Sequence, residues 1–447
     1  MQETSRGWNE LIESISSRLG AEQFHREHRR NDRDFTRDRV LTFPVVVLLL
    51  LQKTTRSIQR HMHSFLHQLW PERGGVSVTP GGWTQARAKL RHTAFIELNQ
   101  QIVLPEFYSS SHIEHCQRWR EHRVLGIDGS TLRLPSHAQT IAEFGVSTAI
   151  NQHSNPGADY TLARLSVLYD LLNDLGLDAM MAPQSTGERD MAIAQLPHVH
   201  KDDVLIWDRG FTGFLLMAQV RAHGAHFIGR CSDRSFFTAQ ELFRLNRAGR
   251  SKTVKQFAAP EQQPKLRALN LPLEMTVRFV SVRLPNGDLE VLVTSLLDEA
   301  LYPTEEFLDV YHWRWNHETY HQMLKSRLDL ENWTGQTLEA VRQDVHAAVF
   351  VSNLESILSQ EVQEELSKSD GQRKYPLQVN RAVSYHALKE RLLDLLFKQT
   401  PVDQTISQIQ DWMRCNPVSV RKRNIPRQTI SIKRSYNYQR YLKKSVF

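Results

Sequence analysis

Two short apolar runs of this chain each end on an aspartate, and strand-like and helical patterns alternate between them. The runs are VLGID at residues 124–128 and VLIWD at residues 204–208. Short apolar runs bounded by polar residues are typical of strands buried on both faces. Between them, residues 163–183 resemble two strands around an NDLG turn, and residues 188–196 (ERDMAIAQL) have a helical pattern. Strands joined through a helical crossover predict an α/β sheet with a parallel component.

The remaining patterns predict four regions. Residues 1–118 are expected to be helical, and PVVVLLLL at residues 44–51 reads as a buried helix opened by Pro44, too short to span a bilayer. Residues 119–225 and 300–370 carry the α/β pattern. Residues 226–299 are strand-rich, with a hairpin whose turn is PNGD. Residues 371–447 are expected to form a helical C-terminal region with a basic tail.

The positive charge of the chain is concentrated at its C-terminal end. The formal net charge is +7, and residues 416–447 hold nine Lys or Arg and no Asp or Glu, interleaved with Tyr436, Tyr438 and Tyr441. Such a tail can neutralise phosphates and stack on bases, although a solubilising tail has the same composition. Residues 84–91 carry polar side chains within a helical pattern. They could belong to a helix that reads DNA or to an ordinary solvated helix face.

The cysteines and the N-terminus predict a cytoplasmic protein. The three cysteines are scattered, which fits a reducing compartment. The first 20 residues form an amphipathic, acid-containing pattern without the apolar core of a secretion signal.

The stretch YHWRWNHETYHQMLK, residues 311–325, has two competing interpretations. His317, Glu318 and His321 spell H-E-x-x-H, the signature of a zinc peptidase. The following QMLKSR lacks the G-x-x-H continuation that would supply a third ligand, so the zinc hypothesis is the weaker one.

The second interpretation uses Glu318 as part of a charged stripe. On a helix of about 100° per residue, a stripe about 60° wide holds four residues: Tyr311, Arg314, Glu318 and Lys325. The opposite side carries Trp313, Tyr320 and Leu324, which predicts that the helix packs through that side and leaves the stripe facing a cleft. A carboxylate flanked by cations and a phenol suits a metal-bound phosphodiester.

Two further carboxylates complete this interpretation. Two-metal phosphoryl transfer needs acids from separate elements that converge on ions about 4 Å apart. Asp128 and Asp208 each end an apolar strand, and strand ends of an α/β sheet open into the crevice where ligands bind. The three acids Asp128, Asp208 and Glu318 are therefore the predicted catalytic set.

These motifs resemble those of bacterial DDE transposases of the insertion-sequence-four family. The resemblance lies in GIDGSTLRLP around Asp128, WDRGF around Asp208, the Y-x2-R-x3-E-x6-K helix, and the flanking YPTEEFLDVYHWRW and LENWTG. It implies a ribonuclease-H-like catalytic core interrupted by a β-rich insertion at residues 226–299. It also implies that Asp128, Asp208 and Glu318 bind two Mg²⁺ ions, with Mn²⁺ able to replace them.

The resemblance also implies partners. The partner would be DNA: terminal inverted repeats bound by the N-terminal helices and the basic tail, and target DNA in the strand-transfer step. Excision in the family can pass through a DNA hairpin at the transposon end. The protein would act as a homodimer in the synaptic complex, in the bacterial cytoplasm at the nucleoid and not at a membrane. The residues assigned to DNA are Tyr311, Arg314 and Lys325, with Arg209 as a further candidate.

One departure from the family concerns base capture. Family members can receive a flipped base on a tryptophan of the insertion, and residues 226–299 contain none. The candidates to replace it are Phe236, Phe237, Phe243 and Phe257. Three other functions remain open: a nuclease that cuts without joining, a non-catalytic DNA-binding protein derived from a transposase, and a zinc peptidase acting through His317, Glu318 and His321.

Overall fold

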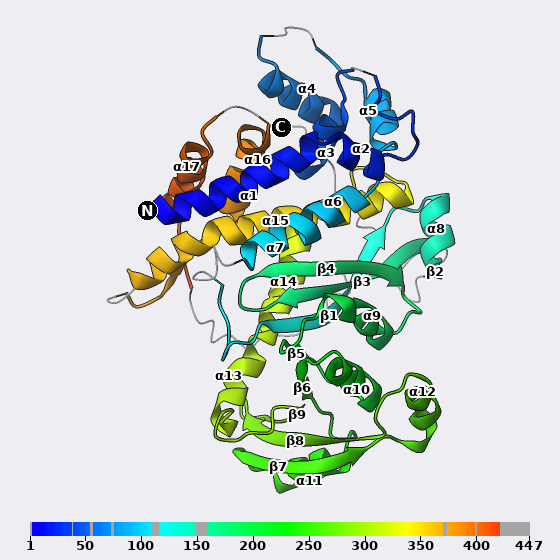
Figure 1. Cartoon of the computed structure of the whole chain (residues 1–447), viewed down its shortest axis with the longest axis vertical. Coiled ribbons are helices and arrows are strands. Elements are labelled where there is room, and N and C mark those ends of the chain that lie inside the picture. Colours follow the sequence, from blue (N-terminus) through cyan, green and yellow to red (C-terminus); the bar gives the residue numbers. More distant parts are fainter. Residues whose placement is uncertain are drawn as a thin grey trace. The chain divides into compact units, whose positions relative to one another are not determined.

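The computed structural model describes residues 2–37, 39–53, 57–72, 76–109, 116–148, 159–369, 373–397 and 400–420 (Figure 1). They form two compact units. Unit 1 comprises Met1–Cys116, Leu132–Leu162 and Met323–Phe447, and unit 2 comprises Gln117–Thr131 and Ala163–Gln322. The basic tail at residues 421–447 lies outside the described residues. The four-region division expected above stays a prediction.

The N-terminal part of unit 1 is helical, as expected. Its elements are α1 (Gln2–Gly20), α2 (Glu22–His28), α3 (Phe43–Leu51), α4 (Ile58–Leu69), α5 (Pro80–Arg87), α6 (Thr93–Glu97), the π-helical turn η1 (Leu98–Val103) and α7 (Leu104–Phe107). Pro44 lies in the first turn of α3, where its missing N–H is not needed. Every other residue of α3 is buried, which explains the unbroken apolar run.

The long helix α15 (Leu338–Lys368) organises unit 1. It contacts α3, α6, α16 (Arg381–Leu396) and α17 (Val402–Cys415), and it appears as the long yellow helix of Figure 1. Burial extends to polar residues of α15, and Asn353 Nδ2 donates to Asn99 Oδ1 of η1 at 2.7 Å. Unit 1 also contains α8 (Ala138–Phe144), β2 (Ser147–Thr148) paired with the start of β3, and the β10 (Leu377–Gln378) and β11 (Val418–Ser419) pair.

The sheet of unit 2 is mixed, which confirms the expected α/β class with a parallel component. Its strands run in the order β3-β1-β5-β6-β9-β8-β7, with β4 pairing with β3. Strands β1 and β5, and β5 and β6, pair in parallel, and the β3–β4, β6–β9, β8–β9 and β7–β8 pairs are antiparallel. The bounds are β1 (Val124–Leu134), β3 (Asp159–Asp170), β4 (Leu175–Pro183), β5 (Val204–Trp207), β6 (His226–Arg230), β7 (Arg250–Phe257), β8 (Glu274–Arg283) and β9 (Leu289–Thr294).

Helices connect these strands. A crossover through α10 (Phe214–Ala222) joins β5 to β6, and α9 (Glu188–Gln195) with the short η2 (Leu196–His198) precedes β5. The segment at residues 226–299 also holds α11 (Phe237–Leu245), η3 (Pro260–Gln262) and α12 (Gln263–Ala268). The predicted β8–β9 hairpin is confirmed, with Gly287 at φ 92° in its turn, a conformation that favours glycine.

Two local expectations were wrong. Strand β1 does not end at Asp128 but continues to Leu134, because it has β3 as a second neighbour beside the short β5. The stretch at residues 311–325 is not one helix: α13 (Phe307–His312), which follows η4 (Thr304–Glu306), and α14 (Arg314–Ser326) meet at Trp313. At this junction the backbone N–H of Trp313 donates to Val310 O at 3.3 Å, a tighter i→i−3 bond than a regular helix makes.

Within the described ranges, none of the helices combines the length and the apolar character needed to cross a bilayer.

Candidate active site

Strand register brings Asp128 and Asp208 together. Strands β1 and β5 pair with Gly126 opposite Ile206, and both aspartates lie two residues further along. Adjacent strands are about 4.8 Å apart, so this register directs the two carboxylates to one edge of the parallel part of the sheet. Asp128 Oδ1 accepts a hydrogen bond from the Gly129 N–H at 2.8 Å.

Glu318 joins this group from α14. Arg314, one turn earlier on the helix, donates from its guanidinium to Glu318 Oε1 at 2.8 Å. Arg314 is 6% exposed, and its guanidinium also lies over the rings of Tyr311 and Trp315, at 5.6 and 5.2 Å from their centroids. These contacts orient Arg314, and through it Glu318, toward the side of the helix that carries the predicted stripe.

Asp208 has its own side-chain partners, one of which, Arg230, is not among the predicted residues. The Tyr311 hydroxyl donates to Asp208 Oδ1 at 3.4 Å, and Arg230 approaches the same oxygen at 3.3 Å. Arg230 also pairs with Glu290 Oε1 at 2.9 Å, and Glu290 is only 4% exposed. Asp208 is therefore held by a cation that is itself fixed by a buried acid.

The negative charges of the group interact. Burial is the main cause that raises the pKa of Asp128 to about 6; the Glu318 and Asp208 charges act in the same direction, and the Gly129 N–H and Arg314 oppose them. Burial would also raise the pKa of Asp208, but the Arg209 N–H and the charges of Arg314 and Arg230 hold it below its usual value. The site thus keeps Asp208 ionised and places excess negative charge at Asp128.

We expect Asp128→Asn to stabilise the protein above pH 6 in a metal-free buffer. Because the folded state holds the Asp128 proton more tightly than the unfolded chain, ionisation of this carboxyl costs stability. That cost is absent below pH 3.8, the ordinary pKa, and fully present above about pH 6. Thermal melts in EDTA from pH 4 to 8 should show the variant's advantage growing over that window. A variant that melts lower than the wild type at pH 8 would contradict this.

The stripe is less open than predicted. Tyr311 and Arg314 are 2% and 6% exposed, because they pack against the acids and aromatic rings just described, and Glu318 is the more accessible member. On the opposite side, Tyr320 and Leu324 are buried as expected. Lys325 ends the same helix but belongs to unit 1, where burial lowers its pKa and the Glu331 charge offsets part of that effect.

The other DNA candidates are at the surface of unit 2. Arg209 is exposed and follows Asp208 directly. Of the four phenylalanines, Phe237 and Phe257 are 72% and 60% exposed. Phe236 is half-buried against Phe279, with ring centroids 5.7 Å apart. Two of the four are thus accessible to a large ligand.

Among the described residues, no third ligand accompanies His317 and His321 as the zinc hypothesis requires. His317 and His321 stack on each other with ring centroids 4.8 Å apart, and His317 stacks on Tyr169 at 5.4 Å. Burial lowers the pKa of His317 well below its usual value. Among the described residues, these two histidines are not part of any group of three ligand-type side chains with atoms within 4.8 Å of one another. Glu318 is instead paired with Arg314.

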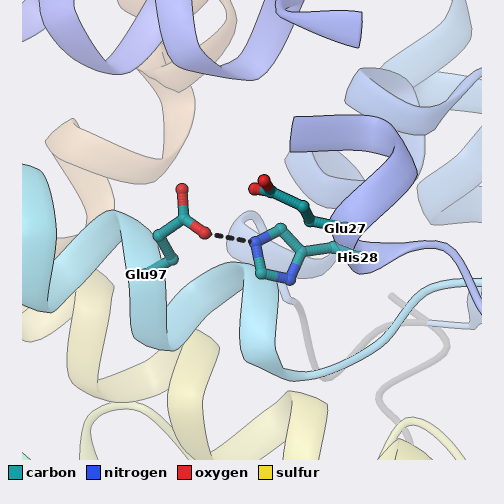
Figure 2. Close-up of side chains that lie close together, drawn as sticks. All are labelled: Glu27, His28 and Glu97. Atoms are coloured by element: carbon teal, nitrogen blue, oxygen red, sulfur yellow. Dashed lines mark hydrogen bonds and ion pairs between the residues drawn. The ribbon is translucent and has the colours of Figure 1, made fainter. Parts of the chain in front are cut away.

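A compact acidic group does occur in unit 1, at Glu27, His28 and Glu97 (Figure 2). His28 Nε2 lies 2.7 Å from Glu97 Oε2, and its Nδ1 lies 2.8 Å from the Thr93 hydroxyl. Arg18 contacts Glu97 Oε1 at 2.6 Å and Glu27 Oε2 at 2.9 Å. Burial lowers the pKa of His28, so the neutral ring can donate to Glu97 and accept from Thr93. Arg18 already supplies the positive charge here, and we interpret the group as a structural network.

The three predicted acids suit a divalent cation by chemistry. Carboxylate oxygens are the ligands that Mg²⁺ prefers, and a cation would offset the Glu318 and Asp208 charges that, after burial, contribute to the raised pKa of Asp128. The carboxylate oxygens of Asp128, Asp208 and Glu318 do not all lie within 4.8 Å of one another. Among the described residues, the ligand atoms of Glu27, His28 and Glu97 do. Arg230 and Arg314 form ion pairs with Asp208 and Glu318.

The strand pattern of the sequence contains a signal for Arg230, which lies outside the motifs described above. Strands β5 and β6 are parallel with Trp207 opposite Gly229, so the next residues, Asp208 and Arg230, are neighbours. A polar residue at the end of β6, the strand that follows VLIWD in the chain, is therefore a candidate neighbour of Asp208. Glu290 gave no such signal, because its place depends on β9 pairing with β6.

Comparison with known proteins identifies the family. Residues 119–354, more than half of the chain, match the model described as the transposase DDE domain. A stretch of 279 residues is 22% identical to "Transposase InsG for insertion sequence element IS4" of Escherichia coli strain K12, and covers 62% of this chain and 60% of that protein. The chain also resembles the solved structure described as "Cryo-EM structure of piggyBac transposase synaptic complex with hairpin DNA (SNHP)", with 13% identity and a TM-score of 0.44; the match covers 95% of this chain and 90% of that chain. The chain belongs to the DDE transposase family, and its sequence places it with the insertion-sequence-four type.

Proposed function

We propose that this protein is a transposase that cleaves DNA at the ends of a mobile element and joins those ends to target DNA. The observation that carries the proposal is the meeting of Asp128, Asp208 and Glu318 from two parallel strands and one helix, close enough that Asp208 and Glu318 both raise the pKa of Asp128. The parallel β1–β5–β6 strands with an antiparallel β3–β4 edge support a ribonuclease-H-like core.

In this proposal the three acids hold two Mg²⁺ ions, with Mn²⁺ able to replace them. When bound, such ions activate the attacking oxygen and stabilise the leaving oxygen of a phosphodiester. Four acids, Asp128, Asp208, Glu318 and Glu290, face two guanidinium groups, Arg230 and Arg314, so the group without ions carries an excess of negative charge. That excess favours cations before DNA arrives.

The cationic side chains position the DNA. Arg314 is buried and held by Glu318 and Tyr311, so it can present donors to a phosphate without losing further side-chain entropy. Arg209 is exposed beside Asp208 and is proposed to contact the strand backbone, as is Lys325. Phe237 and Phe257 are the accessible candidates for stacking a displaced base.

The reaction proceeds in two balanced steps. Water attacks the phosphodiester at the element's end, the P–O3′ bond breaks, and the end is left with a 3′-hydroxyl opposite a 5′-phosphate. That 3′-hydroxyl then attacks a target phosphodiester, forms a new P–O bond and releases a target 3′-hydroxyl. A hairpin at the end is an intermediate consistent with the same chemistry. Two protomers would pair the two ends, with the N-terminal helices and the basic tail on the terminal repeats.

The experiment uses linear DNA that carries the inverted repeats flanking the natural gene. We expect cleavage at the repeat ends with Mg²⁺ and none with EDTA, and joining of pre-cut ends to a plasmid target. Because a protonated Asp128 cannot bind an ion, the rate should fall as the pH drops below about 6. Cutting without joining would identify a plain nuclease. Metal-insensitive binding without any cut product would identify a non-catalytic DNA-binding protein.

A further inference from the structure

Unit 1 contains a cavity of about 730 Å³ that the proposed chemistry does not use. Its walls come from the end of α3, from α4 and α16, and from the residues that follow α14. Four cationic side chains line it, together with two carboxylates: Lys53, Arg60, Arg327, Lys389, Asp329 and Glu390. A cavity of roughly 300–1,000 Å³ can enclose a small ligand, so this one has room for a nucleotide.

Two of these cations, the buried Lys53 and the half-buried Lys389, lie close to each other. Lys53 Nζ donates to Asp329 O at 3.0 Å and to Leu330 O at 3.2 Å, and Lys389 Nζ donates to Lys53 O at 3.1 Å. Burial and the Lys53 charge lower the pKa of Lys389 to about 8, against the opposing charge of Asp329. Backbone carbonyls accept hydrogen bonds but carry no net charge, so the ammonium groups lack full compensation.

Three of the four cavity cations also lack carboxylate partners. In the part of the chain that the structure describes, no Asp or Glu carboxylate oxygen lies within 4.0 Å of the side-chain nitrogens of Lys53, Lys389 or Arg327. This contrasts with Arg18 and Arg87 of the same unit, each of which has a carboxylate within 3 Å. Unpaired cations around one cavity are the arrangement expected for an anion site.

An aromatic pair at the edge of the cavity points to a nucleotide rather than a bare anion. His386 lines the cavity and stacks on Trp412, with ring centroids 6.2 Å apart and an interplanar angle of 20°. Trp412 is 42% exposed, which leaves ring surface for contact with a base. Base stacking on aromatic rings beside cations is the usual means of binding single strands.

We propose that this cavity binds a nucleotide of a DNA strand, with its phosphate between Arg327 and Lys389 and its base toward His386. The identity of the ligand as DNA rests on the proposed transposase function. The site itself rests on the cavity and its unpaired cations.

The test is calorimetric titration of the full-length protein with 5′-phosphorylated trithymidine in metal-free buffer. We expect Arg327→Gln to weaken binding about tenfold, the usual loss for a charge-assisted hydrogen bond. The slope of log affinity against log salt concentration should also become less negative by about 0.7, the change expected when one phosphate contact on a single strand is lost. Ser64→Trp, which fills the cavity from α4 without changing its charge, should weaken binding as well. The matched control is Arg26→Gln on α2, an exposed arginine outside the cavity lining.

Binding of trithymidine that responds to Arg327→Gln and Ser64→Trp but not to Arg26→Gln supports the site. No binding, or binding that neither cavity variant changes, overturns it. Inorganic phosphate that binds as tightly as trithymidine overturns the nucleotide assignment. End cleavage by the same preparation is measured separately, so a failed cavity with intact metal-dependent cleavage leaves the transposase proposal standing. Trithymidine binding without any cleavage removes the transposase proposal alone.

Discussion

Asp128→Asn is expected to lower metal-dependent cleavage of end DNA by about a thousandfold or more, which corresponds to roughly 4 kcal/mol of activation free energy. The amide keeps the size of the side chain and can still accept the Gly129 N–H hydrogen bond. It removes the charge that a divalent ion needs. Asp208→Asn and Glu318→Gln should have losses of the same order. Single-turnover cleavage of labelled end DNA in Mg²⁺ measures all three.

The control for this prediction is Asp233→Asn, which changes an exposed aspartate of the same unit. It should leave the rate within about twofold of the wild type, because surface substitutions away from a site are usually neutral. The stability gain expected for Asp128→Asn separates lost chemistry from lost folding, since an inactive variant should melt no lower than the wild type. Cleavage by Asp128→Asn at more than a tenth of the wild-type rate would remove Asp128 from the catalytic set.

Arg87→Leu should destabilise unit 1 by about 3–5 kcal/mol, the usual cost of removing one partner from a buried ion pair. Arg87 is 4% exposed, and its guanidinium reaches Gln343 Oε1, Ala340 O and Asp344 Oδ1, each at 2.7 Å, and also the Thr334 hydroxyl. Leucine would leave the Asp344 carboxylate, 1% exposed, without its counter-charge. Chemical denaturation followed by circular dichroism should show an earlier unfolding midpoint with the same slope.

A double variant sharpens this test. Arg87→Leu with Asp344→Leu removes both charges, so it should recover a large part of the lost stability, whereas Arg33→Leu at an exposed site should change little. A loss below 1 kcal/mol for Arg87→Leu would show that the network does not hold α5 to α15. The burial of Arg87 also removes it from the residues that could have read DNA from this helix.

Much of the local structure was predictable from short-range patterns. The apolar runs ending at Asp128 and Asp208, the buried α3 opened by Pro44, and the PNGD hairpin all follow from side-chain periodicity and turn chemistry, which act over a few residues. The charged spacing of Arg314, Glu318 and Lys325 is likewise readable, because α-helical geometry repeats it on one side of α14. The sequence by itself therefore determined the elements, the candidate acids and the family.

The tertiary structure alone decided which side chains meet. Arg230 reaches Asp208 because β6 lies beside β5, and Glu290 reaches Arg230 because β9 returns antiparallel to β6. Arg87 lies at a polar position of a helical pattern, yet its side chain is buried. It pairs with Asp344 because α15 supplies that acid from about 250 residues further along the chain. Strand order, register and helix packing join residues that are distant in sequence, and the free energy of each contact depends on burial and counter-charges that no local pattern contains.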